Sequence, residues 1–241
     1  MNNNVPRSSL IDEVYLSPNY NPRGNNTIKY LTPHCIVGQA RAIDVAKTPK
    51  FTTNRTASAN YIIGRDGERL LNVEEFNRAW TSGGKAGTEK VAGKTGKLND
   101  YQAITFECAS DPTHPYGFND KVYTSLFLLW VDICKRYNKT KIVWIPDVKQ
   151  ALAYNVKDNE LQVTLHRWFA SVECPGQWLV DKMQTLVTAV NQELTPSNVP
   201  PVVTDKYYKV QVGAFKNKDN ADKLLAKLKA QGYTDAYIKY E

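Results

Sequence analysis

Two long segments with helical periodicity lie among short strand-like segments, and this alternation constrains the fold of the first 193 residues. A helix is predicted over residues 120–137, where Asn119 is a suitable N-cap and apolar residues form a stripe along one face. A second amphipathic helix is predicted over residues 177–193. The strand-like segments lie at 27–32, 102–109 and 141–145. This pattern predicts an α/β domain with a mixed central β-sheet and helices packed on it.

A hairpin is predicted over residues 58–73, because the pair Asp66-Gly67 separates two apolar runs and this dipeptide favours a tight turn. A loop rich in glycine and lysine follows, from Ala79 to Asn99. Loops of this length are usually functional or disordered. We therefore expect this loop to border a cleft.

A proline-rich segment divides the chain. Residues 195–204 cannot hold a helix and are typical of an extended linker. The predicted parts are an N-terminal arm at 1–26, a main domain at 27–193, a linker at 194–206 and a small module at 207–241. The module has a strand-helix-strand (βαβ) pattern that is too short to be stable alone. We expect it to dock on the main domain or to pair with a second copy as a homodimer.

The chain is basic, with a formal net charge of +7 and a pI near 9.1. Such a charge favours a polyanionic partner, either nucleic acid or an anionic cell wall. No segment has the signature of an RNA-binding sheet or a zinc finger, so we do not expect a nucleic-acid partner. No run is long and apolar enough for membrane insertion. The N-terminus lacks the apolar core of a secretory signal, so we expect synthesis in the host cytoplasm and action on the wall after release.

Three residues have side chains suited to a metal site. His166 and Cys174 stand eight positions apart, and His34 lies just after the strand-like segment 27–32. Three protein ligands with one open position are typical of catalytic zinc, whereas structural zinc has four. The alternative is that the histidines are core or surface residues and that Cys174 is a buried thiol. Cys35 is expected to face away from His34, because side chains alternate along a strand.

Five segments, in this order, resemble the phage-type N-acetylmuramoyl-L-alanine amidases, a zinc amidase family that shares its fold with the peptidoglycan recognition proteins. They are the strand end at His34, residues 59–67, 79–83 and 104–107, and the loop from His166 to Gly176. The resemblance implies that His34, His166 and Cys174 bind Zn²⁺. It also implies that Glu107 is the acidic catalytic residue.

The same resemblance implies an activity. The substrate would be the amide bond between N-acetylmuramic acid and L-alanine in bacterial peptidoglycan, and the role would be that of a phage endolysin that lyses the wall. A host autolysin with the same activity and a non-catalytic peptidoglycan-binding protein are the alternatives. The ligand set argues against the non-catalytic protein, and the missing secretory signal favours the endolysin.

Three further residues are expected to contact the substrate. Tyr61 and Trp80 are candidates for the wall of a cleft, with packing in an aromatic core as the alternative for both. The family often has a lysine two positions before the last ligand, and this chain has Val172 there. A valine cannot donate a hydrogen bond to an oxyanion, so this task would fall to the metal alone or to Arg167.

The C-terminal module resembles half of a SPOR-type peptidoglycan-binding module. The resemblance rests on residues 208–215 and on the helix after them, which is rich in alanine and lysine. It implies a second contact with peptidoglycan.

Overall fold

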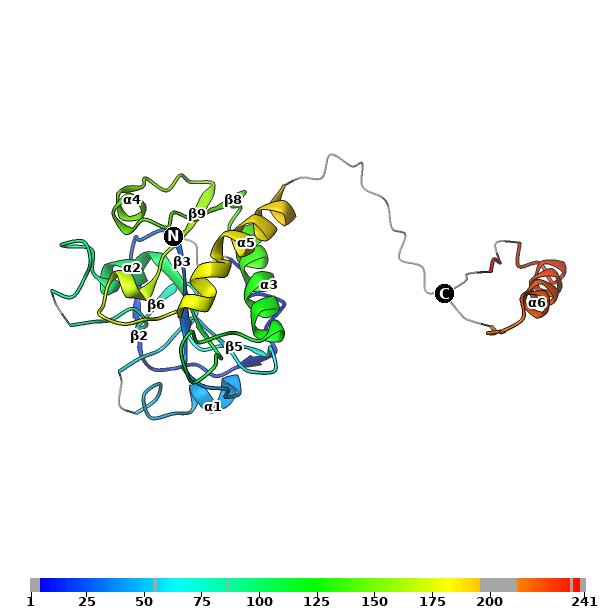
Figure 1. Cartoon of the computed structure of the whole chain (residues 1–241), viewed down its shortest axis with the longest axis horizontal. Helices are drawn as coiled ribbons and strands as arrows, with labels where there is room; N and C mark the ends of the chain where they lie inside the picture. The colour runs from blue at the N-terminus through cyan, green and yellow to red at the C-terminus, as the bar shows by residue number, and fades with distance from the viewer. Residues whose placement is uncertain (1–4, 54–55, 86, 196–211, 235, 239–241) are drawn as a thin grey trace. The chain divides into compact units, whose positions relative to one another are not determined.

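The computed structural model describes residues 5–53, 56–85, 87–195, 212–234 and 236–238. The chain divides into two compact units, Met1–Pro196 and Ser197–Glu241. The larger unit combines a central sheet with helices, and the smaller one contains a single described helix (Figure 1). None of the described helices has the length and apolar character needed to cross a membrane.

A seven-stranded sheet lies at the centre of the larger unit, in the order β1-β5-β4-β7-β3-β9-β8. These strands are β1 (Glu13–Val14), β3 (Tyr30–Cys35), β4 (Tyr61–Ile63), β5 (Arg69–Leu71), β7 (Ala103–Cys108), β8 (Lys141–Val143) and β9 (Glu160–Val163). A separate two-stranded sheet pairs β2 (Tyr20–Pro22) with β6 (Asn77–Ala79). Only the β4–β5 pair of the large sheet is antiparallel. The sheet is therefore mixed, as the sequence predicts.

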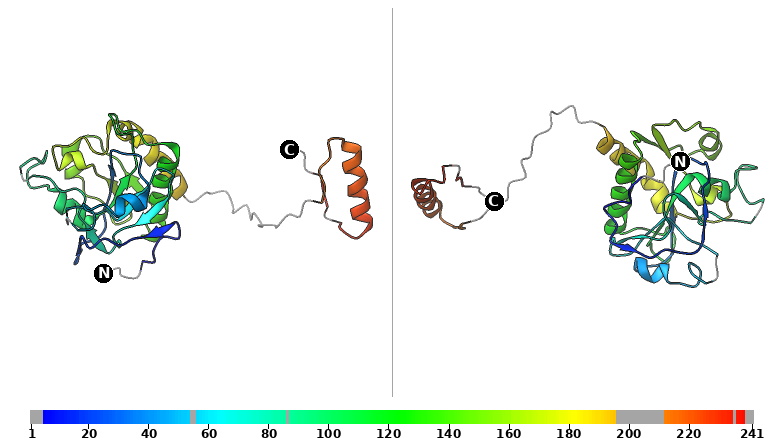
Figure 2. Two further views of the ribbon diagram at one scale, coloured as in Figure 1. Left: turned by 90° about the horizontal axis from the view of Figure 1, so that it is seen from below. Right: turned by 180° about the vertical axis from the view of Figure 1, so that it is seen from behind.

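Two long helices cover the sheet and lie side by side, α3 (Asp120–Arg136) and α5 (Gln177–Leu194) (Figure 1). Their apolar stripes are buried in the same core as the central strands. The Oδ1 atom of Asn119 accepts a 3.0 Å hydrogen bond from the backbone N–H of Val122, so the predicted N-cap is confirmed. The shorter helices are α1 (Ala42–Ala46), α2 (Gly96–Gln102), α4 (Val148–Ala153) and the 3₁₀ turn η1 (His166–Trp168). Figure 1 and the right-hand view of Figure 2 show α1 and α4 on opposite sides of the larger unit.

The predicted hairpin is present, but its connection is longer than two residues. Gly64 to Glu68 join β4 to β5, and the backbone N–H of Gly64 donates to the Glu68 carbonyl at 3.0 Å. Gly67 has φ +83°, a left-handed conformation that favours glycine. The Asp66-Gly67 pair therefore marks the turn without fixing its length.

The expectation of a separate N-terminal arm at residues 1–26 is wrong for its described part. β1 adds to the edge of the large sheet beside β5, and β2 pairs with β6. Arg23 is only 4% exposed, and its guanidinium donates to the carbonyls of Glu75, Asp100 and Ala103 at 2.6–2.7 Å. The few buried polar side chains of this segment, such as Arg23 and Asn19, bond to carbonyl groups of the domain.

The described part of the smaller unit contains α6 (Lys218–Ala230), in agreement with the predicted helix. Asn217 caps it by accepting from the N–H of Asp219 at 2.9 Å. The expected flanking strands at 207–215 and 233–240 lie partly outside the described residues, and their described parts are not in strands. No described residue of α6 is buried, so this unit has no core of its own within the described residues.

A buried ion pair joins α3 to the segment before β6. The Arg136 guanidinium donates to both carboxylate oxygens of Glu75 at 2.6 and 2.7 Å, and Glu75 also accepts from the hydroxyls of Tyr61 and Tyr137. The Arg136 and Glu75 side chains are only 11% and 9% exposed. Removing one partner of such a pair leaves the other charge buried and uncompensated.

We expect Glu75→Ala to lower the free energy of unfolding by about 3–5 kcal/mol, measured by urea denaturation. Glu74→Ala is the matched control, because its ion-pair partner Arg7 is exposed, and it should cost no more than about 1 kcal/mol. Equal losses in the two variants would contradict the assigned role of Glu75.

Candidate metal centre

Three side chains from distant parts of the sequence meet at the carboxyl end of β3. The ligand atoms of His34, His166 and Cys174 all lie within 4.8 Å of one another. His34 Nδ1 is 3.4 Å from Cys174 Sγ, and the two imidazole rings have centroids 4.8 Å apart. β3 carries His34, η1 begins at His166, and the loop from η1 to α5 carries Cys174. This convergence is the geometry that a shared metal ion requires.

The second nitrogen of each imidazole is already engaged. His166 Nε2 lies 3.0 Å from the Gly83 carbonyl, which can only accept, so this nitrogen carries the hydrogen. His34 Nε2 lies 3.3 Å from the Ser82 hydroxyl. Burial lowers the pKa of both histidines, so both rings are neutral near pH 7. A neutral imidazole held by its far nitrogen is the usual state of a metal ligand.

The segment behind the histidines is itself held by a buried carboxylate. Asp100 accepts from the backbone N–H groups of Thr81 and Ser82 at 3.0 and 2.8 Å. Gly96 lies so close to this segment that a β-carbon there would be 1.5 Å from the Ser82 carbonyl oxygen. Ser82, Gly83 and Asp100 are thus site-positioning residues that sequence reasoning missed. Only the Trp-Thr-Ser-Gly-Gly run from Trp80 pointed to this place.

Arg167 does not line the cleft that contains His34 and Cys174, contrary to its predicted role. Its guanidinium donates to the carbonyl of Glu173 and, at 3.0 Å, to the side chain of Gln177. Its backbone N–H donates to the Cys174 carbonyl at 3.1 Å. These bonds fold the loop back on itself, so Arg167 fixes the position of Cys174.

Cys35 does not face away from the site as strand alternation predicts. It lines the same cleft as His34, and it lies close enough to Cys174 to affect the pKa of that thiol. Cys35 is the last residue of β3, and two residues later, at Val37, the backbone has φ 54°. Burial and the neighbouring Cys35 raise the pKa of the Cys174 thiol. Metal binding would therefore be coupled to loss of this proton.

Glu107 lies beside His34 in the sheet. The two residues are register partners in the parallel β3–β7 pair, which places their side chains on the same face. The carboxylate lines the cleft, and no described residue forms a hydrogen bond with it. Burial raises the pKa of Glu107 to about 7, and the charge of Lys50 opposes part of this shift. Such a carboxyl can both take up and release a proton near neutral pH.

These groups line one cleft of about 1140 Å³. Trp80 and Val172 form parts of its wall, and the Trp80 indole N–H donates to Asn21 at 2.7 Å. Lys50 also lines it, and no described acidic side chain pairs with its ammonium group. Sequence reasoning missed Lys50 because it stands in a turn with no recognisable motif.

Tyr61 does not contact the cleft, which corrects its predicted role. It is 1% exposed, stacks on Phe106 with ring centroids 5.7 Å apart, and donates its hydroxyl to Glu75. Tyr61 lies in a strand buried on both faces, so its apolar ring packs in the core as the alternative interpretation holds.

Zinc suits this donor set. Two neutral imidazoles and one thiolate are ligands that zinc binds well, and three protein ligands leave a position for water or substrate. The hydrogen bonds at the far nitrogens of His34 and His166 provide the outer support that such sites usually have. The residues present therefore fit a zinc ion.

Two segments of the chain match models of known protein families. The model of the N-acetylmuramoyl-L-alanine amidase family matches residues 24–177, and the model of the SPOR domain matches residues 204–241. A search among curated proteins found no match.

The chain is also similar to several solved structures. A selenomethionine derivative of AmpD is 20% identical, with 75% of this chain and 96% of that chain covered and a TM-score of 0.46. PlyL is 16% identical, with 78% and 98% covered and a TM-score of 0.46. The Staphylococcus aureus hydrolase AmiA, in complex with its ligand, is 13% identical, with 76% and 82% covered and a TM-score of 0.48.

The family match includes β3, β7 and the loop from η1 to α5, and thus all three candidate ligands and Glu107. Since this match extends over more than half of the chain, the protein belongs to the N-acetylmuramoyl-L-alanine amidase family.

Proposed function

We propose that this protein is a zinc-dependent N-acetylmuramoyl-L-alanine amidase, which hydrolyses the amide between N-acetylmuramic acid and L-alanine in bacterial peptidoglycan. The observation that carries this proposal is the meeting of His34, His166 and Cys174 beside Glu107 in one cleft. Membership of the family supports the substrate.

The protein's own residues divide the work of amide hydrolysis. His34, His166 and Cys174 would hold the ion, whose Lewis acidity polarises a carbonyl and makes water nucleophilic near neutral pH. Glu107 would take a proton from the attacking water and deliver it to the leaving nitrogen of L-alanine. Trp80 and Val172 would contact the sugar and the peptide of the substrate, because both residues line the cleft.

Lys50 would supply the positive charge that Val172 cannot. It is the exposed lysine that lines the cleft, and its charge acts on Glu107, His34 and His166 alike. An ammonium group in this place would stabilise negative charge that develops on the carbonyl oxygen.

The C-terminal segment would add affinity for peptidoglycan, since it matches the SPOR domain. Lysis of the host wall as a phage endolysin is the role we propose, with an autolysin as the alternative. Homodimerisation through the C-terminal unit stays a prediction.

The test of the proposed function is mass spectrometry of fragments released from purified sacculi. We expect stem peptides with a new L-alanine amino terminus and glycan strands with free lactyl groups, and a chelator should abolish both. Binding to sacculi without any release of fragments would instead indicate a non-catalytic peptidoglycan-binding protein.

Glu107→Gln should retain the metal and lose hydrolysis by about 10²-fold or more, because glutamine cannot accept the proton. Asp44→Asn is the matched control, as Asp44 is an exposed acid that lines the same cleft. Full activity of Glu107→Gln would remove Glu107 from the mechanism.

The same variant has a stability readout in metal-free protein. The folded pKa of Glu107 is raised from 4.5 to about 7, so ionisation opposes folding increasingly as the pH rises between these values. We expect Glu107→Gln to melt at a higher temperature than the parent at pH 8, with little difference at pH 4.5. A lower melting temperature at pH 8 would contradict the buried position of the carboxyl.

Cys174→Ser should lower zinc affinity by more than about 100-fold. Removing a residue that only hydrogen-bonds to a ligand already costs up to about 100-fold in affinity, and Cys174 would be a direct ligand. Metal content after dialysis measures this. Cys35→Ser is the matched control and should keep its zinc. The reverse result would assign the thiolate ligand to Cys35.

Lys50→Gln should lower kcat/KM about tenfold, equivalent to about 1.4 kcal/mol of transition-state stabilisation. Adding Val172→Lys to this variant should restore part of the activity, because Val172 is 43% exposed and lines the same cleft. Lys47→Gln, three residues away and outside the cleft lining, is the control. Unchanged kcat/KM in Lys50→Gln would exclude the proposed role.

A further inference from the structure

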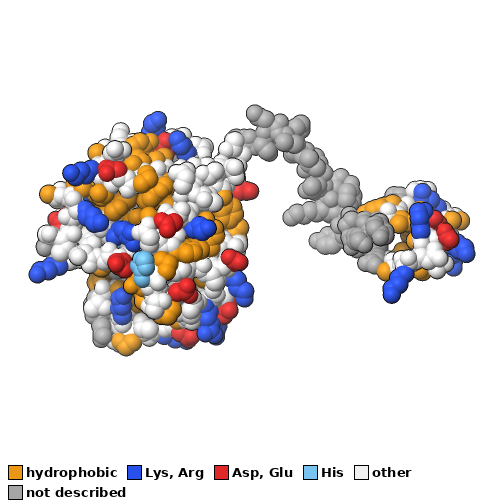
Figure 3. All heavy atoms as spheres, viewed as in Figure 1, with side chains coloured by type: hydrophobic (Ala, Val, Ile, Leu, Met, Phe, Trp, Pro, Cys, Tyr) orange, Lys and Arg blue, Asp and Glu red, His pale blue; other side chains and the backbone are white. Residues whose placement is uncertain are grey.

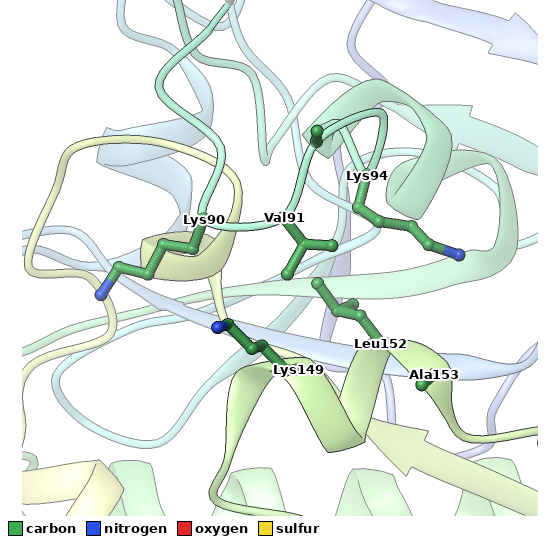
Figure 4. A pocket seen from close by; sticks show the side chains of 7 residues that line it. Lys90, Val91, Lys94, Lys149, Leu152 and Ala153 are labelled. Atoms are coloured by element: carbon green, nitrogen blue, oxygen red, sulfur yellow. The ribbon is translucent and has the colours of Figure 1, made fainter.

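A second groove lies between the glycine- and lysine-rich loop and α4. Its volume is about 540 Å³, and its lining comprises Lys90, Val91, Ala92, Lys94, Lys149, Leu152 and Ala153 (Figure 4). None of these residues lines the cleft of the metal centre. The groove is thus a separate feature of the loop that the sequence singled out.

The groove is strongly one-sided in charge. Three of its lining residues are lysines and none is acidic. Within the described residues, Lys90, Lys94 and Lys149 form no ion pair. By contrast, basic and acidic side chains are interspersed on the face of the larger unit drawn in Figure 3.

The nearest acids in the sequence are occupied elsewhere. The Asp147 carboxylate caps α4 by accepting from the N–H of Gln150 at 2.8 Å. The Glu89 carboxylate accepts from the N–H of Gly87 at 2.8 Å. Neither forms an ion pair with the groove lysines, so the positive charge of the groove is open to an anionic ligand.

Apolar side chains lie between the charges. Figure 4 shows Val91 and Leu152 facing one another, with Lys90 and Lys149 projecting to one side and Lys94 to the other. A ligand that fits has to carry negative charges spaced along its length, with carbon-rich surface between them. A single carboxylate would use only one of the lysines.

The groove is anchored to the structure that carries the metal ligands. The backbone N–H of Lys90 donates to the carbonyl of Trp168, the last residue of η1, at 2.8 Å. A β-carbon at Gly84 would lie 2.6 Å from the β-carbon of Ala170, so the start of the loop also packs closely on this segment. A polymer bound in the groove would therefore be held on the same wall of the domain as His166.

We propose that this lysine groove binds a phosphodiester-linked anionic polymer of the bacterial wall and so holds the catalytic domain on its substrate. Lysine ammonium groups bind phosphate as point charges and need no fixed bidentate geometry. A phosphodiester chain presents such charges at intervals, with apolar carbon faces between them. The inference rests on the proposed function only in that the wall is the target.

The test compares binding of the full chain to purified walls that carry the phosphodiester polymer and to the same walls after acid removal of the polymer. The variant changes Lys90, Lys94 and Lys149 to glutamine together. We expect it to bind the intact walls about tenfold more weakly than the parent. Its salt slope, log Kd against log salt, should be shallower by about 2, as counterion release predicts. On stripped walls, parent and variant should bind alike.

A control variant carries the same charge change at Lys135, Lys157 and Lys182, which are exposed and outside the groove. It should bind intact walls like the parent. The groove variant should also hydrolyse a soluble muropeptide at the parental rate, which separates this inference from the proposed function.

Three results would overturn the proposal. Equal binding of the groove variant and parent to intact walls would show that the groove is an ordinary solvated surface. Equal losses in the groove and control variants would assign the effect to net charge alone. A loss that persists on stripped walls would make the ligand a carboxylate of the peptidoglycan itself.

Discussion

The pairing of β3 with β7 is the constraint on which the site depends. It sets His34 opposite Glu107 near the carboxyl ends of two parallel strands, so that a candidate ligand and a candidate acid-base residue share one face of the sheet. A shift of one residue in this register would turn Glu107 to the other face. The remaining ligands come from η1 and from the loop after it, whereas the backbone hydrogen bonds of the sheet fix the separation of His34 and Glu107.

Two buried glutamates of this domain show how environment decides the role of a carboxylate. Glu75 is surrounded by Arg136 and two tyrosine hydroxyls, and its charge is compensated within the fold. Glu107 is buried to a similar degree, but no described side chain donates a hydrogen bond to it. The bonds of Glu75 hold α3 to the segment before β6. The unpaired burial of Glu107 lowers the stability of the fold and leaves a carboxylate that can accept a proton near neutral pH.

Much of the main domain could be predicted from sequence. The long helices, β3, β7 and the β4–β5 hairpin have strong periodicity or turn signals, and all are present. The short elements β6, α2, α4 and β9 were missed, because segments of three to seven residues form through tertiary contacts and carry little periodicity. The same limit applies to the site. His34, His166, Cys174 and Glu107 belong to recognisable segments, whereas Lys50 and Asp100 reach the site through turns and buried hydrogen bonds that no local pattern records.

The close approach of Gly96 to Ser82 has a consequence for how this protein can change over evolutionary time. Any other residue at position 96 would push back the backbone that orients both imidazoles, although α2 itself touches no ligand. Selection for catalysis therefore acts on position 96 of α2, although the residues that follow it directly, Lys97 and Leu98, face solvent. In a mutagenesis library screened for activity, position 96 should behave like an active-site position, while its exposed neighbours Lys97 and Leu98 accept replacement.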